Sequence, residues 1–216
     1  MTDRTTVHLM RHGEVHNPTG VLYGRLPEFF LSELGHKMAQ AAADALKGRD
    51  VTHLVASPLE RAQETARPTA ESFGLPVVTD ERVIEAANSF EGSTFGVGAG
   101  SLRHPAVWWR LRNPLLPSWG EPYTEIAARM RSAIADAREA ARGHEAVIVS
   151  HQLPVWIARR FFERKSFVHD PRRRECTLAS LTSLTFEGDE FVGLEYSEPA
   201  GHLLPDELRG KFVGGA

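Results

Sequence analysis

The stretch VHLMRHGEVHNPTG, residues 7–20, starts with apolar residues and turns polar at Arg11, where glycine and proline soon follow. Extended back to residue 5, the apolar part has the length of one strand and is bounded by polar residues on both sides. A run of this kind predicts a buried β-strand. Two chemically active side chains, Arg11 and His12, therefore follow directly after a buried strand.

The same stretch carries three histidines, His8, His12 and His16, at four-residue intervals. On a helix this spacing would put them on one face and suggest a metal site. Gly13, Pro18 and the strand-like sequence argue against a helix, so we expect no metal here. His8 is then expected in the core, and His16 at the mouth of a pocket or in solvent.

Strand-like runs and helical patterns alternate along the rest of the chain. Apolar runs at 51–56, 76–78 and 146–150 predict further buried strands, separated by helical periodicity. The sequence Ser57-Pro-Leu-Glu60 has the pattern of a capping box and predicts a helix start, and Pro68 is expected to kink or end that helix. A long helix is predicted from Glu121-Pro122 to Gly143.

The runs 178–186 and 190–196, joined through Glu187-Gly188-Asp189, predict an antiparallel hairpin. Strand–helix alternation predicts an α/β fold, a mostly parallel sheet with helices on both faces, and the hairpin would form its antiparallel edge. We find no repeat and no linker, which predicts one domain over residues 1–216. The segment from about 92 to 120 fits neither pattern and is interpreted as an insertion that either closes as a lid or packs on the surface.

The amino-acid composition limits the kinds of molecule that the protein is expected to bind. Hydrophobic residues make up 42% of 216, and 25 Lys+Arg against 28 Asp+Glu give a net charge of −3. With a net charge this small, the protein has no overall positive electrostatic field that would attract nucleic acid or an anionic membrane, so neither partner is expected. The single cysteine, Cys176, cannot form an internal disulfide, and we see no signal sequence and no apolar run of 18 residues. A cytoplasmic protein is expected, with a homodimer left open.

Reactive side chains follow three of the predicted strands. Arg11 and His12 follow the first, Ser57 and Arg61 follow the run 51–56, and His151 follows the run 146–150. The carboxyl ends of parallel strands meet at one edge of the sheet, where ligands bind. Two arginines and two histidines are therefore expected around one point.

Such a pocket suits a tetrahedral dianion. The planar guanidinium of arginine matches phosphate oxygens, and a helix N-terminus adds oriented N–H groups. A neutral imidazole can attack phosphorus and form a phosphohistidine, which divides one difficult displacement into two easier ones. The leaving oxygen then needs a proton, for which residues 80–92 offer Asp80, Glu81, Glu85 and Glu91. Glu85 is favoured because it follows an apolar pair, and partial burial would raise its pKa.

The block LMRHGE, residues 9–14, resembles the signature of the histidine phosphatase superfamily, the phosphoglycerate-mutase-like enzymes. The similarity continues in family order through 31–40, 57–66, 84–92, 120–130 and 147–152. The resemblance implies a three-layer α/β/α sandwich that needs no metal and no organic cofactor. It implies that His12 is the phosphorylated nucleophile, that Arg11, Arg61 and His151 bind the phosphoryl group, and that Glu85 is the proton donor.

The chain departs from the family pattern in three places. Asn17 lies five residues after His12, where the family usually has a phosphate-contacting asparagine at six, and residues 86–92 shorten the usual pattern after the acid. Gln152 stands where many members have glycine. Asn17, Tyr23, Gly24 and Gln152 are the remaining candidates for substrate binding.

A phosphomonoesterase acting on a small phosphorylated metabolite through phosphohistidine is the expected function. The alternatives are a phosphoglycerate-type mutase on the same site and a non-catalytic module that binds a phosphorylated ligand. The arginines at 172–174 predict either a solvated basic run or a rim that attracts anions.

Overall fold

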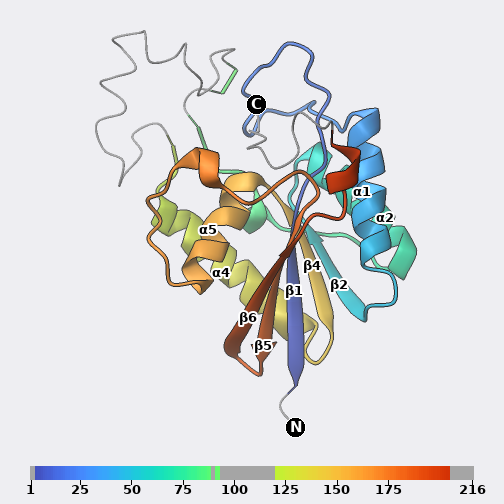
Figure 1. The fold of residues 1–216 in the computed structure, drawn as a ribbon, viewed down its shortest axis with the longest axis vertical. Helices are drawn as coiled ribbons and strands as arrows, with labels where there is room; N and C mark the ends of the chain where they lie inside the picture. The colour runs from blue at the N-terminus through green and yellow to red at the C-terminus, as the bar shows by residue number, and fades with distance from the viewer. Residues whose placement is uncertain (1–2, 89–90, 93–119, 205–216) are drawn as a thin grey trace.

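The computed structural model describes residues 3–88, 91–92 and 120–204. These residues form a six-stranded sheet with the order β3-β2-β4-β1-β5-β6 (Figure 1). The strands are β1 (Arg4–Arg11), β2 (Val51–Ala56), β3 (Val78–Thr79), β4 (Glu145–Ser150), β5 (Leu181–Glu187) and β6 (Glu190–Ser197). The first four are mutually parallel, whereas β5 pairs antiparallel with both β1 and β6. The predicted α/β class with an antiparallel edge hairpin is confirmed.

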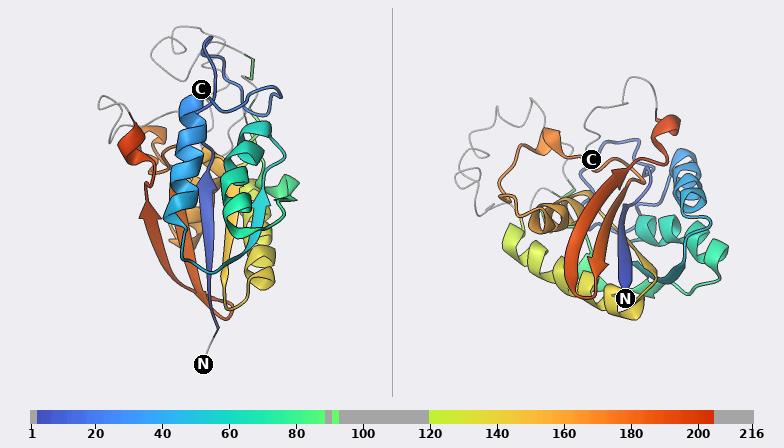
Figure 2. Two further views of the ribbon diagram at one scale, coloured as in Figure 1. Left: turned by 90° about the vertical axis from the view of Figure 1, so that its right-hand side faces the viewer. Right: turned by 60° about the horizontal axis from the view of Figure 1, so that its bottom comes forward.

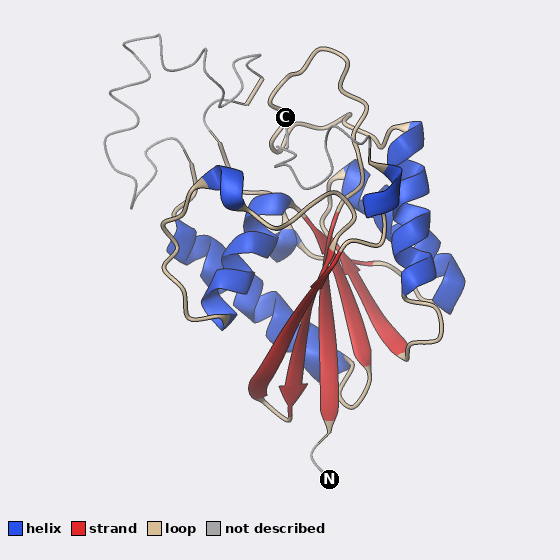
Figure 3. Cartoon of the chain, in the orientation of Figure 1, coloured by secondary structure: helices blue, strands red, loops and turns tan. Residues whose placement is uncertain are grey.

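Helices cover both faces of this sheet. They are α1 (Glu33–Ala45), α2 (Glu60–Phe73), α4 (Tyr123–Ala140) and α5 (Gln152–Phe162), with short 3-10 turns η1 (Glu81–Val83), η3 (Pro171–Arg173) and η4 (Gly201–Leu203). Figure 2 shows α1 and α2 together on one side of the strands, and Figure 3 shows α4 and α5 on the other. The described residues therefore form three layers.

Each face has its own apolar core, and the alternation of side chains along the strands decides which residue joins which. Val7 and Leu9 of β1 pack with Ile126 and Met130 of α4. Met10, the next residue of β1, packs on the opposite face with the α1 and α2 side chains. Full burial of a Leu, Ile or Met side chain contributes about 1.5–3 kcal/mol, so both layers are held mainly by this packing.

Helix α2 differs from its prediction at its start, and it does not end at Pro68. It begins at Glu60 with Leu59 as N-cap, and Ser57 does not cap it. Pro68 does not end the helix, which continues to Phe73 and stops at Gly74 in the left-handed conformation. A proline inside a helix costs about 3 kcal/mol. Burial of the α2 face that carries Ala62, Ala66 and Thr69 offsets this cost and keeps the helix continuous.

Strand β5 starts three residues later than predicted. Residues 178–180 are diverted because Ala179 adopts a positive φ of 53° and its N–H donates to the carbonyl of His12. The hairpin itself follows the prediction, since Gly188 has a φ of 58° between β5 and β6. The segment interpreted as an insertion, 92–120, for which a lid and surface packing were both left open, lies outside the described residues except for its two ends. Within the described part of the chain, no helix is long and apolar enough to cross a membrane.

Candidate active site

The loops that follow β1, β2 and β4 meet at the carboxyl edge of the sheet. Arg11 is the last residue of β1, and the N–H of His12 donates to the carbonyl of Ser150 at 3.0 Å. The N–H of Ser57 donates to Val149 at 3.0 Å, and His151 forms the N-cap of α5. Backbone pairing thus continues past the ends of the strands and brings the predicted residues together.

The ring of His12 is buried and held in one tautomer. Its Nδ1 lies 2.7 Å from the carbonyl oxygen of Gly13, and a carbonyl can only accept, so Nδ1 carries the hydrogen. Nε2 is then the nitrogen with a free lone pair. Burial lowers the pKa of His12 well below its usual range, and the charges of Arg61 and Arg11 lower it further. The ring is therefore neutral at neutral pH.

A substitution of Gly13 by any other residue would force the backbone to move. A Cβ there would lie 2.6 Å from the carbonyl oxygen of Gly35, where α1 approaches this loop. The N–H of Gly13 also donates to the hydroxyl of Thr65 on α2, at 3.1 Å. The carbonyl that orients His12 is therefore fixed by both neighbouring helices.

The second imidazole lies beside the first. The ring centroids of His12 and His151 are 5.2 Å apart, and both residues are buried. Nε2 of His151 is 2.8 Å from the hydroxyl of Ser57, whereas its Nδ1 is buried with no hydrogen-bond partner in the described part of the chain. Burial, followed by the charge of Arg61, lowers the pKa of His151 well below its usual range.

Two arginines complete the buried cluster, each fully shielded from solvent. Nη1 of Arg11 donates to the carbonyl of Cys176 at 2.7 Å. Nη2 of Arg61 donates to the carbonyl of Gly24 at 2.5 Å, and its guanidinium carbon lies 4.6 Å from the centroid of the Tyr23 ring. Nε and Nη1 of Arg61 are buried and meet no acceptor among the described residues. A buried cation with free donors is suited to an anionic ligand.

Glu85 follows η1 at the side of this cluster. Its Oε1 accepts the N–H of Ala86 at 2.8 Å. Burial raises the pKa of Glu85, and the backbone bond from Ala86 together with the charges of Arg61, Arg11 and Arg174 opposes that rise. A carboxyl group whose pKa lies nearer neutrality is able to donate a proton.

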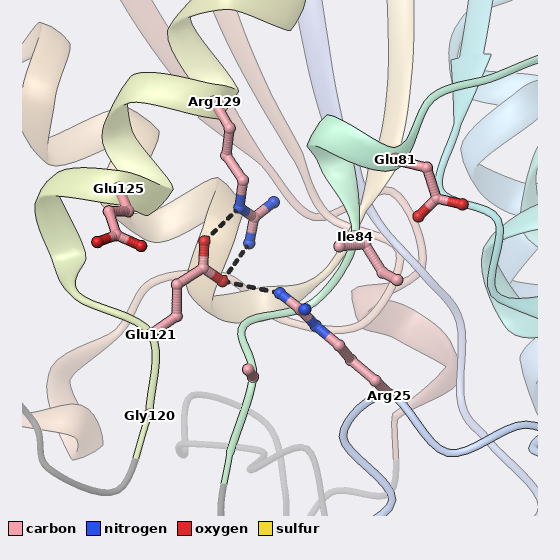
Figure 4. A pocket seen from close by; sticks show the side chains of 8 residues that line it. Arg25, Glu81, Ile84, Gly120, Glu121, Glu125 and Arg129 are labelled. Atoms are coloured by element: carbon pink, nitrogen blue, oxygen red, sulfur yellow. Dashed lines mark hydrogen bonds and ion pairs between the residues drawn. The ribbon is translucent and has the colours of Figure 1, made fainter.

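An open pocket of about 620 Å³, lined by Ile84 and Ala87 on either side of Glu85, lies between this segment and the start of α4. Figure 4 shows Arg25 and Arg129 reaching the carboxylate of Glu121 from two sides, at 2.8 and 2.7 Å. Nε of Arg25 also donates to the backbone carbonyl of Glu85, at 2.6 Å. These ion pairs connect the loop of residues 20–25, the Glu85 segment and α4. The pair between Arg25 and Glu121 could not be predicted from local sequence patterns, because the two residues are 96 positions apart in the chain.

The remaining candidates for substrate binding lie at different distances from the ring of His12. Tyr23 is buried with its ring centroid 6.4 Å from that of His12, and Gly24 provides the carbonyl that holds Arg61. Gln152 is buried at the first position of α5. The side chain of Asn17 is committed to its own loop, since it donates to the carbonyl of Val21 at 2.8 Å and accepts the N–H of Val21 at 3.1 Å.

The three evenly spaced histidines do not meet. His8 is buried in the sheet, where its ring nitrogens contact Ser183 at 2.7 Å and Glu145 at 2.9 Å, as its predicted core position implies. His16 is exposed. Among the described residues, no group of three His, Cys, Asp or Glu side chains is placed to hold a metal ion.

Comparison with known proteins gives the family. A sequence profile of the histidine phosphatase superfamily (branch 1) matches residues 7–199. An uncharacterized protein of Mycobacterium tuberculosis strain H37Rv is 58% identical over 200 residues, which cover 93% of this chain and 99% of that protein. A probable phosphoglycerate mutase of Yersinia pestis is 31% identical over 152 residues, which cover 67% of this chain and 68% of that protein.

Solved structures agree with this assignment. A mycobacterial glucosyl-3-phosphoglycerate phosphatase superimposes with a TM-score of 0.67 and 27% identity, over 83% of this chain and 92% of that one. A phosphoglycerate mutase from Bacillus anthracis, at 17% identity, shares the fold with a TM-score of 0.72, over 94% of this chain and 96% of that one. With its sheet order, its paired imidazoles and these matches, the chain belongs to the histidine phosphatase superfamily.

Proposed function

We propose that this protein is a phosphatase that hydrolyses the phosphate monoester of a small cytoplasmic metabolite through a phosphohistidine on His12. The single observation that carries the proposal is the state of that ring. It is buried and neutral, its Nδ1–H is bound to Gly13, and it lies among Arg11, Arg61 and His151. Its remaining lone pair is on Nε2, the atom that would attack phosphorus.

In the first step, the Nε2 lone pair forms the N–P bond while the bond from phosphorus to the ester oxygen breaks. Glu85 gives its proton to the departing oxygen, which leaves as an alcohol. The fixed guanidinium groups of Arg11 and Arg61 stabilise the charge on the transferring phosphoryl oxygens, since they are already oriented before the reaction. His151 binds one of those oxygens through a ring N–H.

In the second step, water attacks the phosphohistidine. The ionised Glu85 removes a proton from the water, the N–P bond breaks, and the electron pair returns to Nε2. Inorganic phosphate leaves, and both His12 and Glu85 regain their starting states. General acid–base catalysis of this kind typically contributes a factor of about 10²–10⁴.

The test is phosphate release from 4-nitrophenyl phosphate and from an alkyl phosphate by the wild type and two histidine variants. We expect His12→Ala to reduce kcat by a factor on the order of 10⁴ or more, because the covalent route is lost. His16→Ala is the matched control, since His16 lies in the same loop but is exposed, and it should keep the wild-type rate. An active His12→Ala enzyme would refute the mechanism, and an inactive wild type would favour the phosphate-binding module.

A mutase is the second candidate because a relative, at 31% identity, is named a probable phosphoglycerate mutase. A mutase returns the phosphoryl group to the substrate, so the phosphohistidine must be kept from water. Incubation with 3-phosphoglycerate separates the two functions. We expect inorganic phosphate to accumulate, whereas 2-phosphoglycerate formed without phosphate release would support the mutase.

A further inference from the structure

The three arginines at 172–174 do not have the same surroundings. Arg172 and Arg173 are exposed, and Arg172 pairs with Asp170 at 2.9 Å. Arg174 ends the η3 turn and is half-buried. The sequence offered two interpretations for the run, a solvated surface or a rim that attracts anions. The first describes Arg172 and Arg173, and Arg174 needs a separate explanation.

Arg174 is held by neutral groups. Its Nε donates to Nε2 of His169 at 2.8 Å, and its Nη1 lies 3.5 Å from Oε1 of Gln152. Nδ1 of His169 lies 2.6 Å from the carbonyl of Phe167 and therefore carries the hydrogen, which leaves Nε2 as the acceptor. Burial lowers the pKa of His169 to about 4, so this ring stays neutral. No carboxylate forms an ion pair with Arg174 within the described ranges.

Three links place Arg174 at the candidate active site. Gln152, which it approaches, directly follows His151 at the start of α5. Cys176, two residues after Arg174, provides the carbonyl that holds Arg11 at 2.7 Å. The charge of Arg174 also acts on Glu85, after those of Arg61 and Arg11. Arg174 thus approaches the site from the segment after α5, whereas Arg61 approaches from α2.

The neighbours of Arg174 indicate the side of the site that it serves. The ring of His169 lies 5.8 Å from that of Tyr123 at the start of α4, where the N–H of Glu121 donates to the carbonyl of Ala87, two residues after Glu85. In the proposed function Glu85 protonates the leaving oxygen, so groups around it face the alcohol part of the substrate. Arg11 and Arg61 already supply two guanidinium groups for one phosphoryl group. A third guanidinium, partly desolvated and without an ionic partner among the described residues, is therefore available to a charge elsewhere on the substrate.

We propose that Arg174 binds a second anionic group, a carboxylate or another phosphoryl group, on the alcohol part of the substrate. The inference rests on the proposed function and adds a substrate class to it. His169 and Gln152 orient the guanidinium without neutralising it, and the rest of its planar fork is left to the ligand. A charge-assisted bond of this kind discriminates against an ester that lacks the charge.

Three esters of similar size test this class: glycerol 3-phosphate, 3-phosphoglycerate and glycerol 1,3-bisphosphate. The first has a neutral alcohol part, the second adds a carboxylate and the third adds a phosphoryl group. We expect wild type to favour at least one anionic ester over glycerol 3-phosphate in kcat/KM. In Arg174→Gln that ratio should fall by about 10- to 100-fold, the loss of one hydrogen bond to a charged group. The ester with the larger loss identifies the second group.

Two further variants control the result. Arg173→Gln removes the neighbouring, exposed arginine and should preserve the ratio and the rate. Arg174→Lys keeps the charge and should retain most of the preference for the anionic ester. If Arg174→Gln folds poorly, the Arg174→Lys variant tests the inference in its place. Equal losses on all three esters, or a shifted pH profile with an unchanged ratio, would overturn the inference and assign Arg174 an effect on Glu85 alone. If wild type released no phosphate from any ester, the proposed function itself would fail.

Discussion

At the scale of single residues, the protonation of two side chains governs the proposed reaction. His12 must be neutral to attack, and its pKa is lowered well below the usual range by burial and by two arginines. Glu85 must be protonated to assist the leaving oxygen, and burial raises its pKa. The same buried cluster shifts the two groups in opposite directions, and each shift favours the form that the first step needs.

A pH profile follows from these directions. As the pH rises through the raised pKa of Glu85, the proton donor is lost and kcat/KM should fall. As the pH drops through the lowered pKa of His12, the nucleophile becomes protonated and the rate should fall again. We expect Glu85→Gln to lose the alkaline limb and to reduce kcat on an alkyl phosphate by about 10²–10⁴. The loss should be smaller on 4-nitrophenyl phosphate, whose leaving group needs little protonation.

The contrast between the two esters is the internal control of this measurement. An equal loss on both would mean that Glu85 affects phosphoryl transfer without donating a proton. An alkaline limb that persists in Glu85→Gln would assign the acid role to another group.

At the scale of elements, the site depends on how loops are fixed to one another. Glu121, at the start of α4, pairs with Arg129 and with Arg25, and Arg25 donates to the backbone carbonyl of Glu85 (Figure 4). The side chain of Glu121 is only 12% exposed, so solvent screens these pairs weakly. We infer that the network positions Glu85 without contacting the substrate.

Glu121→Gln tests this positioning role. The variant should lose about 1–3 kcal/mol of folding free energy, because two arginines lose their charged acceptor. It should also lower kcat on an alkyl phosphate by roughly tenfold, with the inhibition constant of inorganic phosphate unchanged within about twofold. Glu125→Gln is the matched control, since Glu125 lines the same pocket and is exposed. A drop in phosphate affinity equal to the drop in kcat would contradict the inference.

Sequence patterns located the elements well, because strands of buried apolar residues and amphipathic helices have distinct periods. They failed where tertiary packing decides. Ser57 looked like a helix cap, and its hydroxyl instead binds the ring of His151. Pro68 was expected to kink or end the helix, and the packed face of α2 lets the helix continue past it to Phe73. Neither outcome could be read from local sequence.

At the scale of the whole molecule, the candidate site lowers the free energy of unfolding when no ligand is bound. Arg61 is buried with two donor nitrogens, Nε and Nη1, unsatisfied in the described part of the chain, and two imidazoles are kept neutral by burial. Buried polar groups without partners reduce stability, and functional sites commonly carry such a cost. An anion that enters the site should relieve it.

Inorganic phosphate should therefore raise the Tm. At about 100 times its Kd, a ligand adds about 2.7 kcal/mol, which in a domain of this size corresponds to roughly 5–10 °C. We expect Arg61→Gln to lose this shift, and we expect Arg67→Gln to keep it, because Arg67 is exposed on the same helix. Thermal melts at several phosphate concentrations measure both. A full shift in Arg61→Gln would place phosphate elsewhere.

The convergence of the site was predictable at this scale, since parallel strands deliver their following residues to one edge. Arg11, His12, Arg61 and His151 could be predicted to meet, because each lies at the end of a strand or in the first turn of the helix that follows one. Their individual roles were implied only by the family resemblance. The pair between Glu121 and Arg25 and the approach of Arg174 to Gln152 were not predictable, because these partners are 96 and 22 positions apart in the chain. Such contacts cannot be predicted from local sequence patterns.

The most direct test of the account is the chemistry of the trapped intermediate. Rapid quenching under alkaline conditions during turnover, followed by peptide mass spectrometry and ³¹P NMR, reports which atom holds the phosphoryl group. The hydrogen bond from Nδ1 of His12 to Gly13 predicts phosphorus on Nε2 of His12 and on no other residue. A phosphoryl group on Nδ1, on His151, or on no histidine during active turnover would contradict it.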